Sequence, residues 1–394
     1  MRESVVMHSQ HSLGIGHLQR SFAIAEALAR SFDVVLLNGG PIPRGLSVPR
    51  AVRRIDLPPI VMASDHALRS ADPANSLPVA MAERRNRIAA VVSECRPAAV
   101  MVDLFPFGRK KFREELVAFL QSGRAAGART VASVREILVR SRRDQVAFDR
   151  RALEAANRWI DLVLVHGRWD WTPFVDSFPH AARLRPDVSY TGYVSRPHVA
   201  AAPPTRTLRR EVVVSLGGGR HGAALRSIAL EAQPILWNRC RLATLLVAGP
   251  LVADADWRRL VATSDRRPGL RLLRSVPDLR VVLERAAVSV SQCGYNTFAD
   301  LLQTGVPAVV VPFEAPGEDE QRLRAERMHA RNLVTHLPLA EASGQRLADA
   351  VIRAEQRGRR SGMKLDGADV AARRVARLVR GRTPGCREVG RWTG

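Results

Sequence analysis

Aromatic residues are scarce in this chain of 394 residues, where Phe, Trp and Tyr together make up 5%. Apolar residues nevertheless account for 46%, so aliphatic side chains must fill any core. The sequence also lacks an apolar run of about 20 residues, the length that a helix needs to span a bilayer, and its N-terminus lacks the apolar stretch of a signal peptide. We therefore expect a cytoplasmic protein that is at most peripheral to the inner face of the plasma membrane.

Cysteine is rare as well. The chain has four cysteines, Cys95, Cys240, Cys293 and Cys386. They are isolated from one another and form no C-x-x-C pair. This spacing disfavours both a zinc site and a disulfide framework, and it fits a reducing compartment.

Lysine is almost absent, so arginines carry most of the formal net charge of +23. A positive surplus attracts anions such as nucleic acids, acidic lipids and phosphorylated substrates. The arginines are scattered through helical patterns, however, and no zinc-finger, RNP or basic-zipper pattern is present, so we expect no sequence-specific binding of nucleic acid. The basic residues Arg109, Lys110, Lys111 and Arg113 have two interpretations, contact with an anionic membrane or a solvated helix start.

Short runs rich in β-branched residues alternate with helical patterns along most of the chain. This alternation predicts parallel sheets that are covered on their faces. Strands are predicted at 4–8, 33–37, 98–103, 129–134, 162–165, 211–215, 243–248, 270–273, 288–291 and 308–312. Helices are predicted between many of them, for example at 18–30, 84–94, 111–125 and 223–233, and a last helix at 369–380.

The stretch SRPHVAAAPPTRT, residues 195–207, is rich in proline and small residues and divides the chain nearly in half. Each half opens with a strand, a Gly-rich turn and an amphipathic helix. We therefore predict two doubly wound, Rossmann-like parallel-sheet domains that face each other across a cleft. The predicted bounds are 1–196 for the first domain, 197–208 for a linker, 209–380 for the second domain and 381–394 for a tail. In such sheets, ligands bind beyond the carboxyl ends of the strands.

The stretch SLGGGRHG, residues 215–222, leads from a predicted strand into a predicted helix. Gly217, Gly218 and Gly219 carry no Cβ, so backbone N–H groups can approach an anion, and the helix N-terminus favours negative charge. The turn suits a diphosphate, with Arg220 as a counter-charge. It is neither a P-loop nor a dinucleotide-binding fingerprint, and the alternative is a tight turn that holds no ligand.

A second glycine turn, SLGIGHLQR at 12–20, places Gly14 and Gly16 before His17 at a helix start. A histidine that faces a cleft can act as a general base near neutral pH. The alternatives are a histidine that caps or packs locally, and a turn needed only for close helix–sheet packing.

The stretch SQCGYNTFAD, residues 291–300, combines a turn with a helix start. Gly294 permits the turn, Asn296 or Thr297 can cap the helix, and Thr297 with Asp300 fits a capping box. This local role explains both residues without a ligand. The alternative places the helix N-terminus beside a phosphate, with Asp300 accepting a hydrogen bond from a ribose hydroxyl.

The polar loop PFEAPGEDEQ, residues 312–321, directly follows a predicted strand and ends in Glu320 and Gln321, which open the next helix. Carboxylate and amide groups hydrogen-bond well to sugar hydroxyls. The alternative is an acidic helix start that complements the helix dipole.

These motifs, taken in order, resemble those of GT-B glycosyltransferases of the family 28 type, which include the cell-wall enzyme that adds N-acetylglucosamine to a lipid-linked muramyl peptide. The resemblance depends on Gly-x-Gly-His-x-x-Arg at 14–20, Asp-x-Phe-Pro-Phe-Gly at 103–108, the Gly-Tyr-Asn-Thr turn at 294–297 and the Glu-Gln pair at 320–321. It implies a GT-B fold and a hexosyltransferase. Its N-terminal domain would bind the acceptor, and its C-terminal domain would bind a nucleotide-diphosphate sugar, with UDP as the usual nucleotide.

The resemblance also implies residue roles. Asp300 stands where the family usually has a Glu on the ribose diol, so a shorter acid would make that contact. His17, or the carboxylate of Asp103, would take the proton of the acceptor hydroxyl in a direct displacement that needs no metal and no cofactor. The remaining roles are diphosphate binding by Gly217–Gly219, phosphate and ribose contacts by Gly294, Asn296 and Thr297, sugar binding by Glu320 and Gln321, and a base pocket at Val276.

Three other functions fit parts of the pattern. A non-hydrolysing nucleotide-sugar 2-epimerase has the same architecture and needs no acceptor. A non-catalytic protein that binds a nucleotide sugar or another anion would use the same turn. A basic nucleic-acid protein would bind duplexes in a salt-dependent manner. The sequence leaves the sugar and the acceptor open, and a nucleotide sugar with a separate acceptor is the partner set that the motifs favour.

Overall fold

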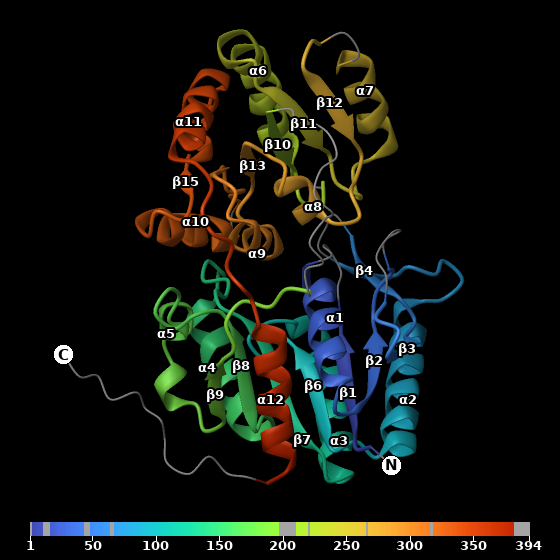
Figure 1. Ribbon diagram of the computed structural model, residues 1–394. Helices are drawn as coiled ribbons and strands as arrows, with labels where there is room; N and C mark the ends of the chain where they lie inside the picture. Colours follow the sequence, from blue (N-terminus) through green and yellow to red (C-terminus); the bar gives the residue numbers. More distant parts are fainter. Residues whose placement is uncertain are drawn as a thin grey trace, which may run out of the picture.

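The computed structural model describes residues 2–10, 16–42, 48–63, 67–196, 210–219, 221–264, 267–315 and 318–381. The described residues form two large parallel sheets, one in each of two domains that are drawn one above the other in Figure 1. The predicted linker at 197–208 lies outside the described residues, and so does the predicted tail after residue 381.

The first sheet has the strand order β3-β2-β1-β6-β7-β8-β9, and every neighbouring pair is parallel. Its strands are β1 (Ser4–Ser9), β2 (Asp33–Asn38), β3 (Val52–Asp56), β6 (Ala99–Asp103), β7 (Arg129–Arg135), β8 (Leu162–His166) and β9 (Asp187–Tyr190). From β1 to β3 the strands follow one another toward one edge of the sheet, and from β6 to β9 they follow one another toward the other edge. The strand order therefore reverses between β1 and β6, where doubly wound sheets bind ligands.

The second sheet has the order β12-β11-β10-β13-β14-β15, again with parallel neighbours. Its strands are β10 (Glu211–Ser215), β11 (Ala243–Val247), β12 (Leu270–Leu273), β13 (Val288–Ser291), β14 (Ala308–Val310) and β15 (Thr335–His336). Here the order reverses between β10 and β13. A short antiparallel pair, β4 (Ile60–Met62) with β5 (Leu68–Ser70), stands apart from both sheets.

Helices cover both faces of each sheet. On the first sheet, α1 and α12 share one apolar cluster, while α2, α3 and α4 share the other. On the second sheet, α6, α7 and α11 cover one face, and α8, α9 and α10 cover the other. The helices are α1 (Gly16–Leu28), α2 (Leu77–Cys95), α3 (Arg113–Ala125), α4 (Gln145–Trp159), α5 (Phe174–Ser177), α6 (Ala223–Cys240), α7 (Asp254–Ser264), α8 (Leu279–Leu283), α9 (Tyr295–Thr304), α10 (Glu320–Ala330), α11 (Gly344–Arg357) and α12 (Gly367–Val379).

All ten predicted strands are present. The prediction missed β3 and β9, the two edge strands of the first sheet, as well as β15 at one edge of the second sheet and the short pair β4 and β5. Strand β3 has the sequence VRRID, in which only Val52 is buried, and β9 has no fully buried residue. Neither forms an apolar run, because an edge strand of this kind packs little of its surface. Helix α6 was predicted to end at 233, but it continues through Pro234 to Cys240, because Leu236 packs into the core on one face of the second sheet.

The last helix corrects the predicted end of the second domain. The predicted range 209–380 includes α12, but α12 packs beside α1 on the first sheet (Figure 1). Its apolar residues Ala368, Ala371 and Val375 lie in the same buried cluster as Leu18. An amphipathic pattern shows that a helix needs an apolar partner, but it does not say which domain supplies that partner.

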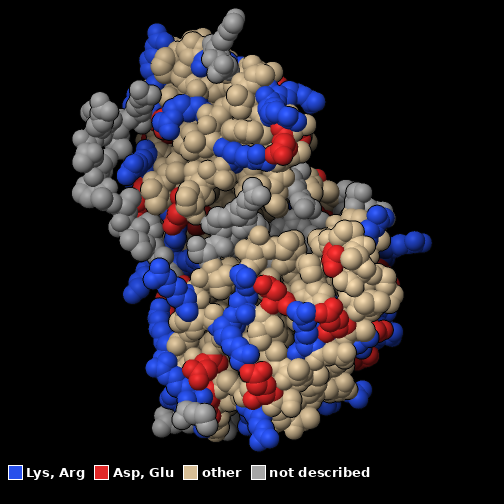
Figure 2. All heavy atoms as spheres, turned by 90° about the vertical axis from the view of Figure 1, so that its right-hand side faces the viewer, with Lys and Arg blue, Asp and Glu red and all other residues tan. Residues whose placement is uncertain are grey.

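On the face drawn in Figure 2, basic side chains are spread out rather than gathered in one patch. They occur there on both domains, and on the first domain they alternate with acidic side chains. Some exposed basic side chains form ion pairs with acidic neighbours, as Arg53 does with Glu94 and Arg87 with Glu83. Lys110 and Lys111 are exposed in a short 3₁₀ turn, Lys110–Phe112, that leads into α3. No helix of the described part is both long and apolar enough to cross a membrane.

Candidate functional site

The first switch point brings His17 and Asp103 together. His17 lies in the first turn of α1, which follows β1, and Asp103 is the last residue of the adjacent strand β6. The imidazole Nδ1 lies 3.1 Å from Oδ1 and 2.9 Å from Oδ2 of Asp103. The Asp103 side chain is almost buried and that of His17 is 20% exposed. The Asp103 carboxylate favours the tautomer with the proton on Nδ1 and a lone pair on Nε2, while Nη2 of Arg20, 3.0 Å from the same Nδ1, opposes it.

Two arginines complete the surroundings of Asp103. An Nη2 N–H of Arg20, one turn after His17 on α1, donates to Oδ1 at 2.8 Å. An Nη2 N–H of Arg109 donates to Oδ2 at 3.0 Å. Arg109 therefore does not belong with the solvated lysines that follow it in the sequence. It points back toward the carboxyl end of β6.

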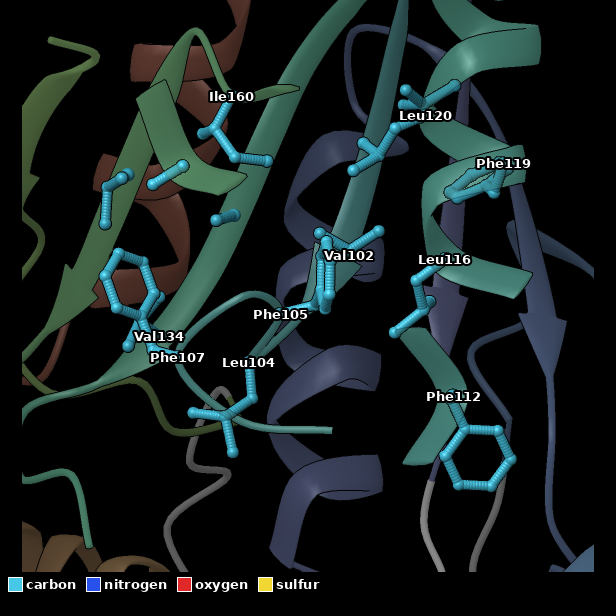
Figure 3. Close-up of a cluster of buried hydrophobic side chains, with 14 of the residues drawn as sticks. Val102, Leu104, Phe105, Phe107, Phe112, Leu116, Phe119, Leu120, Val134 and Ile160 are labelled. Atoms are coloured by element: carbon cyan, nitrogen blue, oxygen red, sulfur yellow. The ribbon is translucent and has the colours of Figure 1, made fainter. Parts of the chain in front are cut away.

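The loop DLFPFG at 103–108 holds this arrangement in place. Phe105 and Phe107 are buried in the first domain (Figure 3), and the Phe107 ring packs edge-on against Phe174 and Phe178 with centroids 5.3 and 5.0 Å apart. Leu104 and Arg109 both have left-handed backbone conformations, with φ of 65° and 58°. Non-glycine residues adopt that conformation uncommonly, and here the two positions flank the two buried rings.

Charge and burial set the protonation of the pair. Burial alone would raise the pKa of Asp103, but His17, Arg109 and Arg20 bring it well below its usual range. Burial lowers the pKa of His17 to about 4; Asp103 opposes this shift, while Arg109 and Arg20 add to it. At neutral pH the imidazole is therefore neutral and the carboxylate is ionised. A neutral imidazole can accept a proton at Nε2, which is what a general base must do.

The second switch point carries the triple-glycine turn. Gly217 and Gly219 have positive φ values of 60° and 92°, a backbone conformation that glycine adopts at little cost. A Cβ on Gly219 would lie 2.8 Å from the carbonyl oxygen of Ala248 and 3.0 Å from the nitrogen of Val252. The turn therefore packs directly on the backbone that follows β11. Arg220 lies outside the described residues, as does Gly14 of the other glycine turn.

One glycine of this site was missed. Gly249 follows β11 with φ of 100°, and a Cβ there would lie 2.6 Å from the carbonyl oxygen of Gly217. The signal was present in the sequence, because Gly249 directly follows a buried strand and precedes Pro250. Gly218 is different, since its Cβ would make only an ordinary contact of 3.7 Å with Leu251.

The capping box predicted for Thr297 and Asp300 is wrong. Gly294 is the N-cap of α9, the helix begins at Tyr295, and no side chain caps it. Tyr295 determines this start because its buried ring packs in the core and its hydroxyl accepts a hydrogen bond from the backbone N–H of Val194 at 2.8 Å. Thr297 and Asp300 thus lie within the first two turns, and capping no longer explains them.

Asn296 reaches the other domain. Its Nδ2 donates to Oε1 of Gln19 on α1. A Cβ on Gly16 would lie 3.7 Å from the same Nδ2, in ordinary contact. The start of α9 therefore lies against the start of α1, and the two switch points face each other.

Asp300 lies in an acidic and poorly solvated position. Burial raises its pKa to about 7, Asp278 adds to the shift, and Arg280 opposes it. Asp278 caps α8 and pairs with the Arg280 guanidinium, with Nη2 2.6 Å from Oδ2. Val276, the predicted base-pocket residue, precedes α8 and is partly buried against the cluster that surrounds Phe298.

Glu320 and Gln321 begin α10 as predicted, but Glu320 already has partners. Its carboxylate accepts from Nη2 of Arg324 at 2.5 Å and pairs with Arg135 of the first domain. Gln321 accepts from the backbone N–H of Phe313 at 3.3 Å. An ionised carboxylate has about four lone-pair directions, so Glu320 keeps acceptor capacity for a hydroxyl.

The arginines of the site were missed as functional residues. Arg20 was part of the Gly-x-Gly-His-x-x-Arg motif without a role of its own. Arg135 is the last residue of the buried strand β7 and Glu136 follows it, and a charged pair at the carboxyl end of such a strand is the signal that points to them. Arg324 looks like any other residue of an arginine-rich helix, and only the structure shows that it is fully buried.

The chain also contains one Asp-x-Asp sequence, which bears on metal binding. Asp254 and Asp256 open α7, where Asp254 pairs with Arg274 and Asp256 lies 3.8 Å from Nη1 of Arg259. In the described ranges, no group of three or more His, Cys, Asp or Glu side chains is placed to hold a metal ion.

Comparison with known proteins extends this picture. Residues 212–376 match the model of the glycosyltransferase family 28 C-terminal domain. The predicted likeness to family 28 is thereby confirmed for this segment, which holds the triple-glycine turn, α9 and α10.

Relatives of the chain are named as glycosyltransferases. An uncharacterized glycosyltransferase of Methanopyrus kandleri is 26% identical over 245 residues, which cover 59% of this chain and 62% of that protein. A UDP-N-acetylglucosamine–N-acetylmuramyl-(pentapeptide) pyrophosphoryl-undecaprenol N-acetylglucosamine transferase of Lactococcus lactis is 26% identical over 164 residues, which cover 41% of this chain and 45% of the relative. The chain thus spans less than two thirds of the length of either relative.

Solved structures resemble the whole chain. The calicheamicin glycosyltransferase CalG4 covers 98% of it with a TM-score of 0.63 at 16% identity, and the match covers 100% of that structure. MurG of Acinetobacter baumannii covers 96% of it with a TM-score of 0.57 at 15% identity, and 99% of that structure is matched. At these identities the likeness concerns the fold. The predicted GT-B fold is confirmed.

Proposed function

We propose that the chain transfers a hexosyl group from a nucleotide-diphosphate sugar, with UDP as the expected nucleotide, to a hydroxyl group of an acceptor. The observation that carries this proposal is the meeting of the two switch points. His17 and Asp103 at the edge of one sheet face α9 and the glycine turn at the edge of the other, and Gln19 contacts Asn296 between them.

The second domain has the features of a donor site. Three loops converge after β10, β13 and β14: the Gln292 side chain donates to the backbone carbonyl of His221 at 2.8 Å, and the His221 ring lies 4.6 Å from that of Phe313. The diphosphate would lie at the glycine turn and the N-terminus of α6, where backbone N–H groups and the helix dipole stabilise negative charge. Asp300, Gly294 and Thr297 are expected to contact the ribose. Glu320 and Gln321 would bind the sugar, and Val276 would line the base pocket.

The first domain would supply the base. Nε2 of neutral His17 takes the proton of the acceptor hydroxyl as its oxygen attacks the anomeric carbon. The bond from that carbon to the phosphate oxygen breaks, and the nucleoside diphosphate leaves with the bonding electron pair. Asp103 stabilises the imidazolium that forms, as an ionised partner at Nδ1 does in other catalytic pairs, and the amides of the glycine turn stabilise the leaving group. This scheme uses no metal and no cofactor beyond the donor.

The same chemistry suggests where the enzyme works and with what. We propose a cytoplasmic reaction in which the nucleotide sugar and a separate acceptor are the partners. An acceptor embedded in an anionic membrane would bring the exposed lysines at the start of α3 close to the lipid surface.

A panel of nucleotide sugars tests the proposal. UDP-, dTDP- and GDP-linked hexoses are each added at about 100 times their dissociation constants, where one bound ligand stabilises the fold by about 2.7 kcal/mol. We expect the melting temperature to rise with at least one of them. Mass spectrometry then follows that donor with candidate acceptors. A donor isomer formed without any acceptor would support the epimerase instead, and no stabilisation by any donor would contradict both functions.

A further inference from the structure

One face of α10 carries a row of charged residues that contact the first domain. The residues at positions 320, 324, 327 and 331 follow one another at intervals of three or four, which places them on one side of the helix and its end. Their partners, Arg135, Glu136, Asp176 and Asp170, all belong to the first domain. Figure 1 shows α10 at the edge of the second domain that is nearest to the first.

The central pair of this row is fully buried. Nε of Arg324 donates to Oε1 of Glu136 at 2.7 Å, and both side chains are 0% exposed. Nη1 of Arg324 donates to the backbone carbonyl of Cys293 at 2.7 Å. A buried ion pair adds little net stability, but it tolerates few geometries, because either charge left alone is strongly unfavourable. The pair therefore fixes the position of α10 relative to the first domain.

The other pairs of the row extend this contact. Nη2 of Arg327 lies 2.9 Å from Oδ2 of Asp176, and Nη2 of Arg331 donates to the backbone carbonyl of Asp170 at 2.8 Å. The side of α10 next to this row is apolar, since Ala325 and Met328 are fully buried in the core of the second domain. The helix is thus packed on its own domain by apolar side chains and on the other domain by charged ones.

Glu320 stands at the first position of this row. One of its two cationic partners is Arg324 on its own helix, and the other is Arg135, at the carboxyl end of β7 in the first domain. Burial alone would raise the pKa of Glu320, but Arg135 and Arg324 lower it below its usual value. The carboxylate is therefore held ionised, and it remains an acceptor for hydroxyl groups.

We propose that α10 couples the closure of the two domains to recognition of the donor sugar, and that Arg135 is a positioning residue for this recognition. The inference rests on the proposed function, since it assigns the sugar to Glu320. The glycine turn, which would hold the diphosphate, belongs wholly to the second domain. The carboxylate that would hold the sugar is oriented by a guanidinium of the first domain. The nucleoside diphosphate then binds without domain closure, whereas the sugar adds affinity only when the domains are closed.

Calorimetry with UDP and UDP-N-acetylglucosamine separates these two contributions. The ratio of the two affinities measures what the sugar adds. We expect Arg135→Gln to leave the UDP affinity unchanged and to reduce that ratio by about tenfold, the effect of losing one charged hydrogen-bond partner. Arg53→Gln is the matched control, because Arg53 pairs with Glu94 on the exposed surface of the same domain. The inference is overturned if Arg135→Gln keeps the wild-type ratio or weakens both ligands equally.

Hydrogen exchange of the ligand-free protein tests the coupling without any nucleotide. Arg135→Gln and Asp176→Asn should each speed exchange of the amides in 320–331 by about tenfold, since local opening governs that rate. Arg53→Gln should not change it. Unchanged exchange in both variants overturns the coupling. A wild-type protein that binds neither UDP nor any sugar nucleotide contradicts the proposed function, and the exchange experiment still decides whether the row holds α10.

Discussion

At the residue scale, the charges around Asp103 decide what His17 can do. Two arginines and the imidazole share one carboxylate, so the carboxylate stays ionised and the imidazole stays neutral. A histidine with a pKa of about 4 is a weak base. Negative charge brought by a nucleotide diphosphate favours the protonated form and moves that pKa toward neutral, so binding of the donor would strengthen the base.

Replacing His17 tests its assignment as the base. We expect His17→Ala to lower kcat by about 10²- to 10⁴-fold, the usual share of general base catalysis, with little change in the dissociation constant of the donor. Steady-state kinetics and calorimetry on the same preparation measure the two quantities. His180→Ala is a suitable control, because that imidazole contacts the Phe178 ring instead of a carboxylate. Normal turnover by His17→Ala would make His17 a structural residue.

Asp300 should link stability to pH in the opposite sense from most acids. Its pKa in the folded protein is about 7, above its usual value of 3.8. Between pH 3.8 and about 7, the folded state therefore keeps a proton on Asp300 that the unfolded state has lost. The free energy of unfolding falls as the pH rises through this range. We expect Asp300→Asn to melt at a higher temperature than wild type at pH 8, with the difference shrinking toward pH 4.

The same substitution should weaken the donor, because an amide offers a ribose diol fewer acceptors than a carboxylate does. Thermal melts across pH and calorimetry at pH 8 measure the two effects. Asp187→Asn, at an exposed position of β9, is the control and should change neither. If Asp300→Asn leaves the pH dependence of the melting temperature as it is in wild type, the Asp300 carboxyl is not the group that titrates.

At the element scale, the turn after β10 distinguishes two neighbouring glycines. Gly219 has φ of 92° and backbone atoms at 2.8 and 3.0 Å from the position of a Cβ, whereas Gly218 has only Leu251 at 3.7 Å. We expect Gly219→Ala to reduce the free energy of unfolding by about 1–3 kcal/mol and to abolish donor binding. Gly218→Ala should leave stability nearly unchanged.

Urea unfolding and calorimetry with UDP measure both variants of this turn. Because the substitutions are identical and adjacent, the Gly218→Ala protein controls for the added methyl group. Equal behaviour of the two proteins would show that the backbone conformation of the turn does not matter for binding.

Elements were predictable where a local pattern is enough to specify them. The strands that flank both switch points are buried on both faces, so they appear as apolar runs, and Gly217 and Gly219 follow β10 where the turn has positive φ. The start of α9 was not predictable in this way. Thr297 and Asp300 have the spacing of a capping box, but the buried contacts of Tyr295 begin the helix earlier. Tertiary packing outweighs a cap of about 1 kcal/mol.

At the scale of the whole molecule, the sequence predicts two domains and the edge at which each binds, but it does not predict how the domains meet. Sequence spacing contains no signal for a pair such as Glu136 and Arg324, which lie in different domains. The same holds for Gln19 and Asn296. The candidate residues were therefore largely predictable one by one, while their contacts across the interface were not. Those contacts determine which of them orient a ligand and which orient each other.

Helix α12 follows the second domain in the sequence but packs on the first, so the chain connects the two domains a second time. Val375 is fully buried against the first sheet, beside α1. The segment that leads to it, from β10 to α11, belongs to the second domain. We expect Val375→Asp to destabilise the first domain by about 3 kcal/mol or more, because it buries an unpaired carboxylate. Hydrogen exchange should then accelerate in α1 and not in α11. Arg377→Asp, at an exposed position of the same helix, should leave exchange in α1 unchanged. Faster exchange in α11 instead would assign α12 to the second domain.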